Sequence, residues 1–202
     1  WNIAEEPFMK GGKAFSALKL RLGYGETGQQ EIGSVYQFLP NYFLGTETAQ
    51  YQFGSNYYQV SRPQAYDKKL KWETTTTYNA GVDFGILNGR VNGSLDYYFK
   101  KTKDLLAFVP VPAGTNFSNG IFTNVGTMNN HGVELQINTN IIRRTDLNWE
   151  VGFNVTYNKN EITKLSLVDD PSYGVLVGGI SGGVGNTVQI HTVGYQPYSF
   201  YV

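Results

Sequence analysis

Hydrophobic and polar positions alternate along much of this chain with a period of two residues. Over residues 78–86 the even-numbered positions are apolar and the odd-numbered ones are small or polar. After the Asn88-Gly89 pair the alternation resumes on odd numbers, over residues 91–99. Such alternation predicts β-strands that turn one face toward an apolar environment and the other toward a polar one.

The Asn88-Gly89 pair predicts a hairpin between these two strands, because a type I′ turn needs positive φ at both central residues. The strands are expected over about residues 72–87 and 90–101, and the second can continue to about residue 109. With this turn each apolar residue faces an apolar partner, as Val82 faces Leu95. The pattern therefore predicts an antiparallel hairpin with one apolar face.

Two further stretches show the same alternation. A strand is expected near the start of the chain, over about residues 14–25. A second hairpin is predicted from residues 133–141 and 147–157, in which the apolar residues are odd-numbered. Odd positions face odd positions only across a loop with an odd number of residues. We therefore expect a turn of about three or five residues centred on Arg144.

The connections between the expected strands are short at one end of the strands and long at the other. Those at residues 88–89 and 143–146 are tight, whereas those at 26–71, 110–130 and 159–193 are long. Long loops are uncommon in compact domains. Short turns at one end and long loops at the other are typical of outer-membrane β-barrels.

In such a barrel the apolar faces contact lipid and the polar faces line the lumen. Strands of about 12 residues span roughly 40 Å, which is enough for a tilted strand to cross a bilayer. The predicted lipid-facing residues are Leu18, Leu20, Leu22, Val82, Phe84, Leu95, Leu135, Ile137, Val151 and Phe153. The predicted lumen-facing residues are Lys19, Arg21, Asp83, Asp96, Glu134 and Glu150.

The same pattern fits a stand-alone β-sandwich that binds glycan or acts as an adhesin. In that structure a second sheet covers the apolar residues, including Leu18, Val82 and Phe153. The strand pattern alone leaves both architectures open.

Composition narrows the function. The net charge is zero and charged residues make up 16% of the chain, so no basic field points to nucleic acid. There is no cysteine, and aromatics reach 15%. No apolar run is long enough for a membrane-spanning helix. The first residues lack a signal peptide's basic and apolar segments, so we expect a chain that begins within a longer or processed protein.

Candidate chemistry is sparse. His131 and His191 are the only histidines and neither has a partner at ligand spacing, so we expect no catalytic residue, no metal site and no cofactor. The best candidates for contact with a substrate or partner are the aromatics of the longest loop. They are Tyr36, Tyr42, Phe43, Tyr51, Tyr57, Tyr58 and Tyr66.

Several motifs resemble the SusC/RagA-type TonB-dependent outer-membrane transporters of the Bacteroidetes. They occur in that family's order and cover nearly the whole chain. The motifs are FSALKLRLGYGETGQQ (15–30), LKWETTTTYNAGVDFGILNGRVNGSLDYYFKKTKDLL (70–106), NVGTMNNHGVELQIN (124–138), WEVGFNVTYNKNEITKL (149–165) and VGYQPYSFYV (193–202).

The resemblance implies an all-β fold, an antiparallel transmembrane barrel of which this chain supplies about six of 22 strands. It implies one unit, residues 1–202, belonging to the C-terminal half of the barrel, with no plug domain and no TonB box. The implied function is TonB-energised uptake of oligosaccharides, or in some members peptides, rather than catalysis.

The resemblance also implies the location and the partners. The protein is expected in the outer membrane of a Gram-negative bacterium, with a SusD-like surface lipoprotein and, through the missing N-terminal part, TonB. Lipid or lipopolysaccharide is a further expected partner, whereas nucleic acid is not. The residues themselves leave two interpretations of the basic stretch 100–103, contact with lipopolysaccharide phosphates or a solvated strand end, and the solvated strand end is favoured.

Overall fold

The computed structural model describes residues 1–9, 12, 14–31, 36–45, 48, 50–112, 114, 118–167, 170, 172–180 and 187–201. Antiparallel strands dominate these residues, and a short 3-10 helix, η1 (Ile3–Glu5), lies before the first strand. None of the helical structure described is long and apolar enough to pass through a membrane. The all-β expectation is therefore confirmed.

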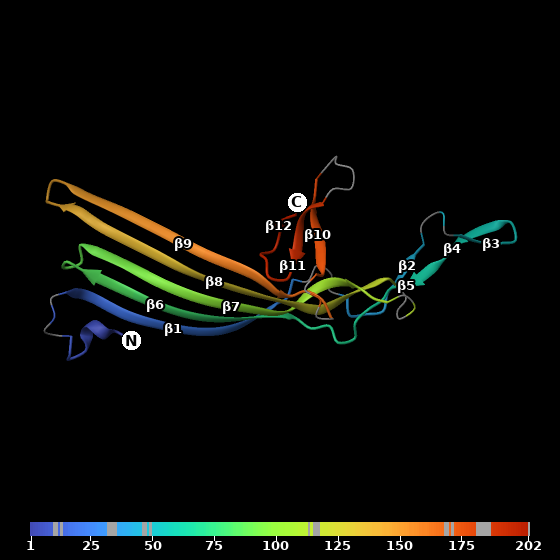
Figure 1. Ribbon diagram of the computed structural model, residues 1–202, viewed down its shortest axis with the longest axis horizontal. Helices are drawn as coiled ribbons and strands as arrows, with labels where there is room; N and C mark the ends of the chain where they lie inside the picture. The colour runs from blue at the N-terminus through green and yellow to red at the C-terminus, as the bar shows by residue number, and fades with distance from the viewer. Residues whose placement is uncertain are drawn as a thin grey trace.

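Five long strands form one curved sheet in the order β1–β6–β7–β8–β9 (Figure 1). Their bounds are β1 (Phe15–Gln29), β6 (Glu73–Ile86), β7 (Val91–Pro110), β8 (Gly120–Arg143) and β9 (Asn148–Lys164). All neighbours run antiparallel. The β6–β7 and β8–β9 turns lie together at one end of the sheet, with the N-terminal residues (Figure 1). We call this sheet the wall.

The first predicted hairpin is confirmed in its register. Val82 pairs with Leu95 and Asp83 pairs with Ser94. Asn88 and Gly89 both have positive φ, of 53° and 77°, as the predicted turn requires. Leu87 also has a positive φ, of 53°, so the last ladder pair is Ile86 with Val91.

The predicted length of the second turn is wrong. Along most of the β8–β9 ladder odd positions do face odd positions, as Val133 faces Tyr157. Between Asn140 and Ile142, however, the register shifts, and Ile142 faces Trp149. This bulge adds one residue to β8 and reverses the parity, so the turn holds the four residues 144–147.

The loops are shorter than the sequence predicts because the strands are longer. Residues 120–130, expected as a loop, belong to β8, and β9 continues to Lys164. The β8 extension carries Ile121, Phe122 and Val125 without a strict alternation of apolar and polar positions, so its period-two signal is weak. Gly120 and Gly126 weaken the strand signal further, because glycine is depleted in strands.

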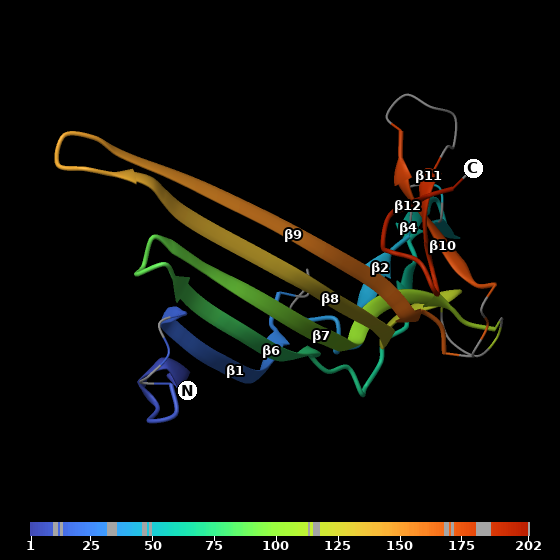
Figure 2. The same cartoon turned by 60° about the vertical axis from the view of Figure 1, so that its left-hand side comes forward.

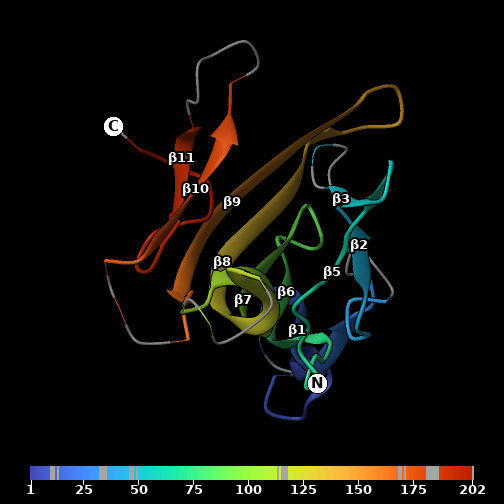
Figure 3. The same cartoon turned by 90° about the vertical axis from the view of Figure 1, so that its right-hand side faces the viewer.

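Smaller sheets lie at the other end of the wall. One pairs β2 (Tyr42–Leu44) with β5 (Ser61–Pro63), and a second pairs β3 (Gln50–Phe53) with β4 (Asn56–Gln59). A third joins β10 (Gly174–Gly179), β11 (Thr187–Thr192) and β12 (Ser199–Phe200). In Figure 2, β10–β12 lie at the end of the wall away from the β6–β7 and β8–β9 turns. Figure 3 shows β10 and β11 on the β9 side of the wall, and β2, β3 and β5 on the β1 side. We call the end of the wall that carries these smaller sheets the outer end.

The described part of the wall has five strands, one fewer than expected. Of the residues 193–201, only two lie in a strand, β12, which pairs with β11. Short pairings nevertheless continue both edges of the wall. The Trp1 amine donates to the carbonyl of Leu20, and Ile162 exchanges backbone hydrogen bonds with Gly194 and Tyr195.

The ladder separates the two predicted residue sets onto opposite faces of the wall. One cross-strand row contains Leu20, Val82, Leu95, Leu135 and Val155, and a neighbouring row of the other face contains Arg21, Gly81, Asp96, Glu134 and Thr156. All the residues predicted to face lipid share the first face, and all those predicted to face the lumen share the second. Which face meets lipid stays a prediction.

The apolar face is not covered by other described residues. Leu22, Phe153 and Tyr157 expose 76%, 58% and 65% of their surface. A β-sandwich requires a second sheet here, and in the described part of the chain none covers these residues. The few buried apolar residues all lie toward the outer end: Ala65, Val109, Val125 and Ile162.

Candidate functional site

Two places concentrate polar and aromatic side chains: a cavity at the outer end and an ion-pair network on the polar face of the wall. The cavity is built on the tips of β7 and β8, which continue as a two-stranded ribbon to the pair Pro110–Gly120. Phe108 and Phe122 face each other across this ribbon, with ring centroids 5.2 Å apart. Gly120 leaves room for the Phe108 ring, since a Cβ at that position would overlap the ring carbons.

The chain segment that returns from the longest loop is tied to this ribbon. The Asn124 amide donates to the carbonyls of Lys71 and Asp104 and accepts from the Lys71 N–H, over 2.6–2.8 Å. The Lys71 ammonium lies 2.9 Å from the Asp104 carboxylate. Thr123 donates to Asp67 over 2.6 Å, and the Leu106 N–H donates to Glu73 over 2.9 Å. These bonds place β5 beside the ribbon.

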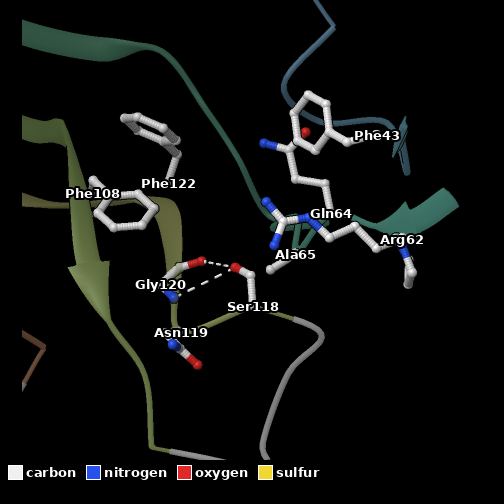
Figure 4. A pocket seen from close by; sticks show the side chains of 10 residues that line it. Phe43, Arg62, Gln64, Ala65, Phe108, Ser118, Asn119, Gly120 and Phe122 are labelled. Carbon is white, nitrogen blue, oxygen red and sulfur yellow. Dashed lines mark hydrogen bonds between the residues drawn. The ribbon is translucent and has the colours of Figure 1, made fainter. Parts of the chain in front are cut away.

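Between β5 and the ribbon lies a cavity of about 250 Å³ (Figure 4). A neighbouring cavity of about 270 Å³ shares Phe43, Gln64, Ala65 and Phe122 with it. We call the two together the loop pocket, and they reach the size of a small-molecule site, ~300–1,000 Å³. The first cavity is lined by Phe43, Arg62, Pro63, Gln64, Ala65, Phe108, Ser118, Asn119, Gly120 and Phe122.

The structure divides the aromatics that the sequence singled out. Phe43 lines both cavities and Tyr66 lines the second. Tyr51 and Tyr58 instead pair across the separate β3–β4 hairpin, where Tyr57 is also exposed. Tyr36 and Tyr42 are exposed and line neither of these cavities.

Sequence analysis missed most of the pocket. Phe122 was overlooked because residues 110–130 were taken as a loop, and Phe108 was not singled out although apolar alternation continues through Leu106 and Phe108. Arg62 and Gln64 carry no sequence signal, because β5 has only three residues. Only the pairing of Phe43 with Arg62 brings these side chains to one place.

On the polar face of the wall, Arg21 joins carboxylates from two other strands. Its Nη2 lies 2.8 Å from Asp83 and 2.8 Å from Asp96, and its Nε donates to Asp83 over 2.9 Å. Asp96 is two strands away and is reached across Gly81, where a Cβ would overlap the Asp96 carboxylate. Because Gly81 has no side chain, Arg21 can reach Asp96, and the ion pairs join three strands.

The two histidines lie apart. His131 sits in a row of the apolar face between Phe99 and Lys159. His191, in β11, makes an edge contact with the Tyr198 ring at 4.5 Å and lines an apolar cavity of about 330 Å³. Burial lowers the pKa of His191 from its usual 6.5. The described residues contain no cluster of three or more histidine or acidic side chains placed to hold a metal ion.

The basic residues 100–103 do not form one patch. Lys100 lies on the polar face of the wall, with its ammonium 5.1 Å from the Tyr98 ring centroid. Lys101 and Lys103 lie on the apolar side. They sit beyond an aromatic row in which Tyr24, Tyr78 and Phe99 are neighbours, with centroids 5.3 and 6.5 Å apart.

Comparisons with known proteins agree with this geometry. The family model described as TonB dependent receptor-like, beta-barrel matches residues 13–198. The chain is 51% identical over its whole length to TonB-dependent receptor SusC of Bacteroides thetaiotaomicron, of which it covers 20%. It is 37% identical to TonB-dependent receptor P39 of Formosa agariphila, over 82% of this chain and 15% of that one.

Solved structures match over almost the whole chain. The RagAB peptide transporter superposes with a TM-score of 0.75 and 28% identity, over 99% of this chain and 20% of that one. The RagAB peptide importer in its open-open state gives a TM-score of 0.78 and 29% identity. The chain thus spans a fifth or less of the length of these relatives.

Proposed function

This chain belongs to the TonB-dependent receptor-like β-barrel family, and we propose that it forms wall and outer loops of an outer-membrane importer in a Gram-negative bacterium. The importer takes up oligosaccharides with energy from TonB and works with a SusD-like lipoprotein. Residues 1–202 are one part of its barrel, and the plug and TonB box belong to other parts of the protein. The chain itself performs no catalysis and holds no cofactor.

The observation that carries this proposal is the two-faced wall. From Ile86 to Tyr78 the apolar face extends about 26 Å along β6, at roughly 3.3 Å per residue. At the 35–45° tilt of such strands this length spans roughly 18–21 Å of height, which is most of the apolar band of about 25 Å found in outer-membrane barrels. The aromatic row at Tyr78 then marks the outer interface, and Lys101 and Lys103 beyond it meet lipid headgroups or lipopolysaccharide.

Oligosaccharide is favoured over peptide on two grounds. The resemblance of the sequence motifs to SusC/RagA-type transporters implies oligosaccharide uptake, with peptides taken up by some members only, and the identity to the RagAB peptide transporter is 28%. The loop pocket also offers aromatic rings beside the amides of Gln64 and Asn119, which suit sugar rings and hydroxyls. Peptide is the second candidate, supported by the superposition on RagAB.

The loop aromatics divide into two proposed roles. Phe43 and Tyr66 contact the substrate in the loop pocket. The β3–β4 hairpin, with Tyr51, Tyr57 and Tyr58 exposed, contacts the lipoprotein partner, because rigid aromatic side chains are favoured at protein interfaces.

Uptake by the full-length protein tests the proposal. A labelled oligosaccharide should reach the periplasm only when TonB is present, and Phe43→Ala with Phe122→Ala should reduce uptake several-fold. Phe8→Ala, at an exposed position between η1 and β1, is the control and should have no effect. Tyr51→Ala with Tyr58→Ala should weaken copurification of the lipoprotein. TonB-independent uptake, or uptake of peptides alone, would contradict the proposal.

A further inference from the structure

The charged side chain that lines the loop pocket is a cation. Arg62 is the one charged residue among the ten that line the first cavity, and the second cavity adds none. No carboxylate of the described residues lies within 4.0 Å of its guanidinium, whereas the carboxylates of Asp83 and Asp96 hold Arg21, and Asp104 holds Lys71. Arg62 therefore keeps its hydrogen-bonding capacity for another molecule.

The backbone aims this guanidinium into the cavity. Arg62 and Phe43 are direct partners in the β2–β5 ladder, so both side chains leave the same face of that sheet. Figure 4 shows the guanidinium between the Phe43 and Gln64 side of the cavity and the Gly120 and Phe108 side. A ligand that enters the cavity from its open side therefore contacts the Arg62 guanidinium.

The remaining lining is apolar or uncharged. Phe108 and Phe122 present ring surface, and Gln64 and Asn119 present amides that can bond hydroxyls. A planar guanidinium matches a carboxylate with two parallel hydrogen bonds. The fitting ligand thus has an apolar ring face, hydroxyls and a carboxylate, which is the chemistry of a uronic acid.

We propose that the loop pocket selects acidic oligosaccharides by pairing a uronate carboxylate with Arg62. This inference rests on the proposed oligosaccharide import and specifies its substrate class. Because Arg62 is exposed, the pair is partly screened and weakens as salt concentration rises. A charge-assisted hydrogen bond near the low end of its range corresponds to roughly tenfold in affinity.

Binding to the full-length transporter with its lipoprotein, measured by calorimetry in detergent, tests the inference. The probes are trigalacturonate and its full methyl ester, in which a methyl group caps each carboxyl group and removes its charge. Trigalacturonate should bind roughly tenfold more tightly than the ester. Arg62→Gln should remove that difference, and Arg62→Lys should retain part of it. Lys69→Gln removes the same charge outside the cavity and should leave the difference intact.

The outcomes separate this inference from the function on which it rests. Equal affinity for acid and ester overturns the acidic preference, and an equal loss of both in Arg62→Gln overturns the pairing of the carboxylate with Arg62. Binding of neutral maltohexaose without binding of either galacturonide also overturns it, and leaves oligosaccharide import standing. Binding of peptides and of no saccharide overturns the proposed function itself.

Discussion

The wall and the loop pocket reach their structures in different ways. In the wall each residue is placed by a long ladder of backbone pairs, and neighbouring pairs repeat the same geometry. In the loop pocket the strands are as short as three residues, and single side chains such as Asn124 hold distant segments together. Wall positions therefore tolerate loss of one side-chain contact better than pocket positions do.

The cations of the two regions also differ in whether carboxylates pair with them. Arg21 in the wall is held by two carboxylates and contributes to the structure of a sheet. Arg62 in the pocket has no such partner among the described residues. A paired cation indicates a structural role, and an unpaired one in a cavity indicates binding.

The largest expected effect comes from charging the apolar face of the wall. Val82→Arg or Leu95→Arg, at the middle of the apolar band, should destabilise the assembled barrel by ~2–4 kcal/mol. The folded fraction in the outer membrane, measured by heat-modifiable gel migration, should fall sharply.

The paired positions on the other face provide the control. Asp83→Asn and Ser94→Ala leave the lipid contact unchanged and should have much smaller effects on assembly. Equal tolerance at both sets of positions would show that the faces have been assigned incorrectly.

A smaller effect is expected where one side chain supports the loop pocket. Asn124→Ala removes three hydrogen bonds to Lys71 and Asp104, and because two of them are exposed we expect each to contribute about 0.5 kcal/mol, the low end of the net range. Hydrogen exchange at residues 67–73 should accelerate while β6 and β7 stay protected. The exposed Asn56→Ala at the hairpin tip should change neither, and global unfolding in Asn124→Ala would contradict a local role.

Filling the gap at Gly81 should have a still smaller effect. Gly81→Ala places a Cβ against the Asp96 carboxylate and 2.9 Å from Arg21 Nη2, so the ion pairs must shift. Because these side-chain ends are flexible and partly exposed, the expected loss is ~0.2–1 kcal/mol, seen as a lower melting temperature. Gly23→Ala, where the Cβ meets Asn79 only at 3.6 Å, is the matched control. A similar loss in both variants would mean that the network contributes nothing.

The smallest effect concerns pH at the outer end. Burial lowers the folded-state pKa of His191, so the unfolded state binds the proton more readily. The stability of β10–β12 should be complete above about pH 6.5 and should decline as pH falls below that value. The other titratable side chains that line the cavity beside His191 are those of Lys164 and Tyr198. Hydrogen exchange corrected for its intrinsic pH dependence should show this decline, and His191→Gln should remove it.

Particular residues show where sequence reasoning succeeds. Val82 and Leu95, or Asp83 and Ser94, were paired correctly from alternation and one turn. The second hairpin shows its limit. The bulge after Asn140 changes the turn from an odd to an even number of residues. The adjacent residues Ile141 and Ile142 break the alternation at this point, but the pattern does not show which of them joins the apolar face.

Alternation is a local property repeated along every strand, so it is enough to predict the class of fold, the two faces of the wall and most of its register. The folded arrangement alone shows that Arg21 reaches Asp96 across Gly81, and that Arg62, Phe43 and Phe122 line one cavity. Those contacts join residues far apart in the chain through a few specific bonds. No repeating pattern records them, so they become visible only when the segments are placed in space.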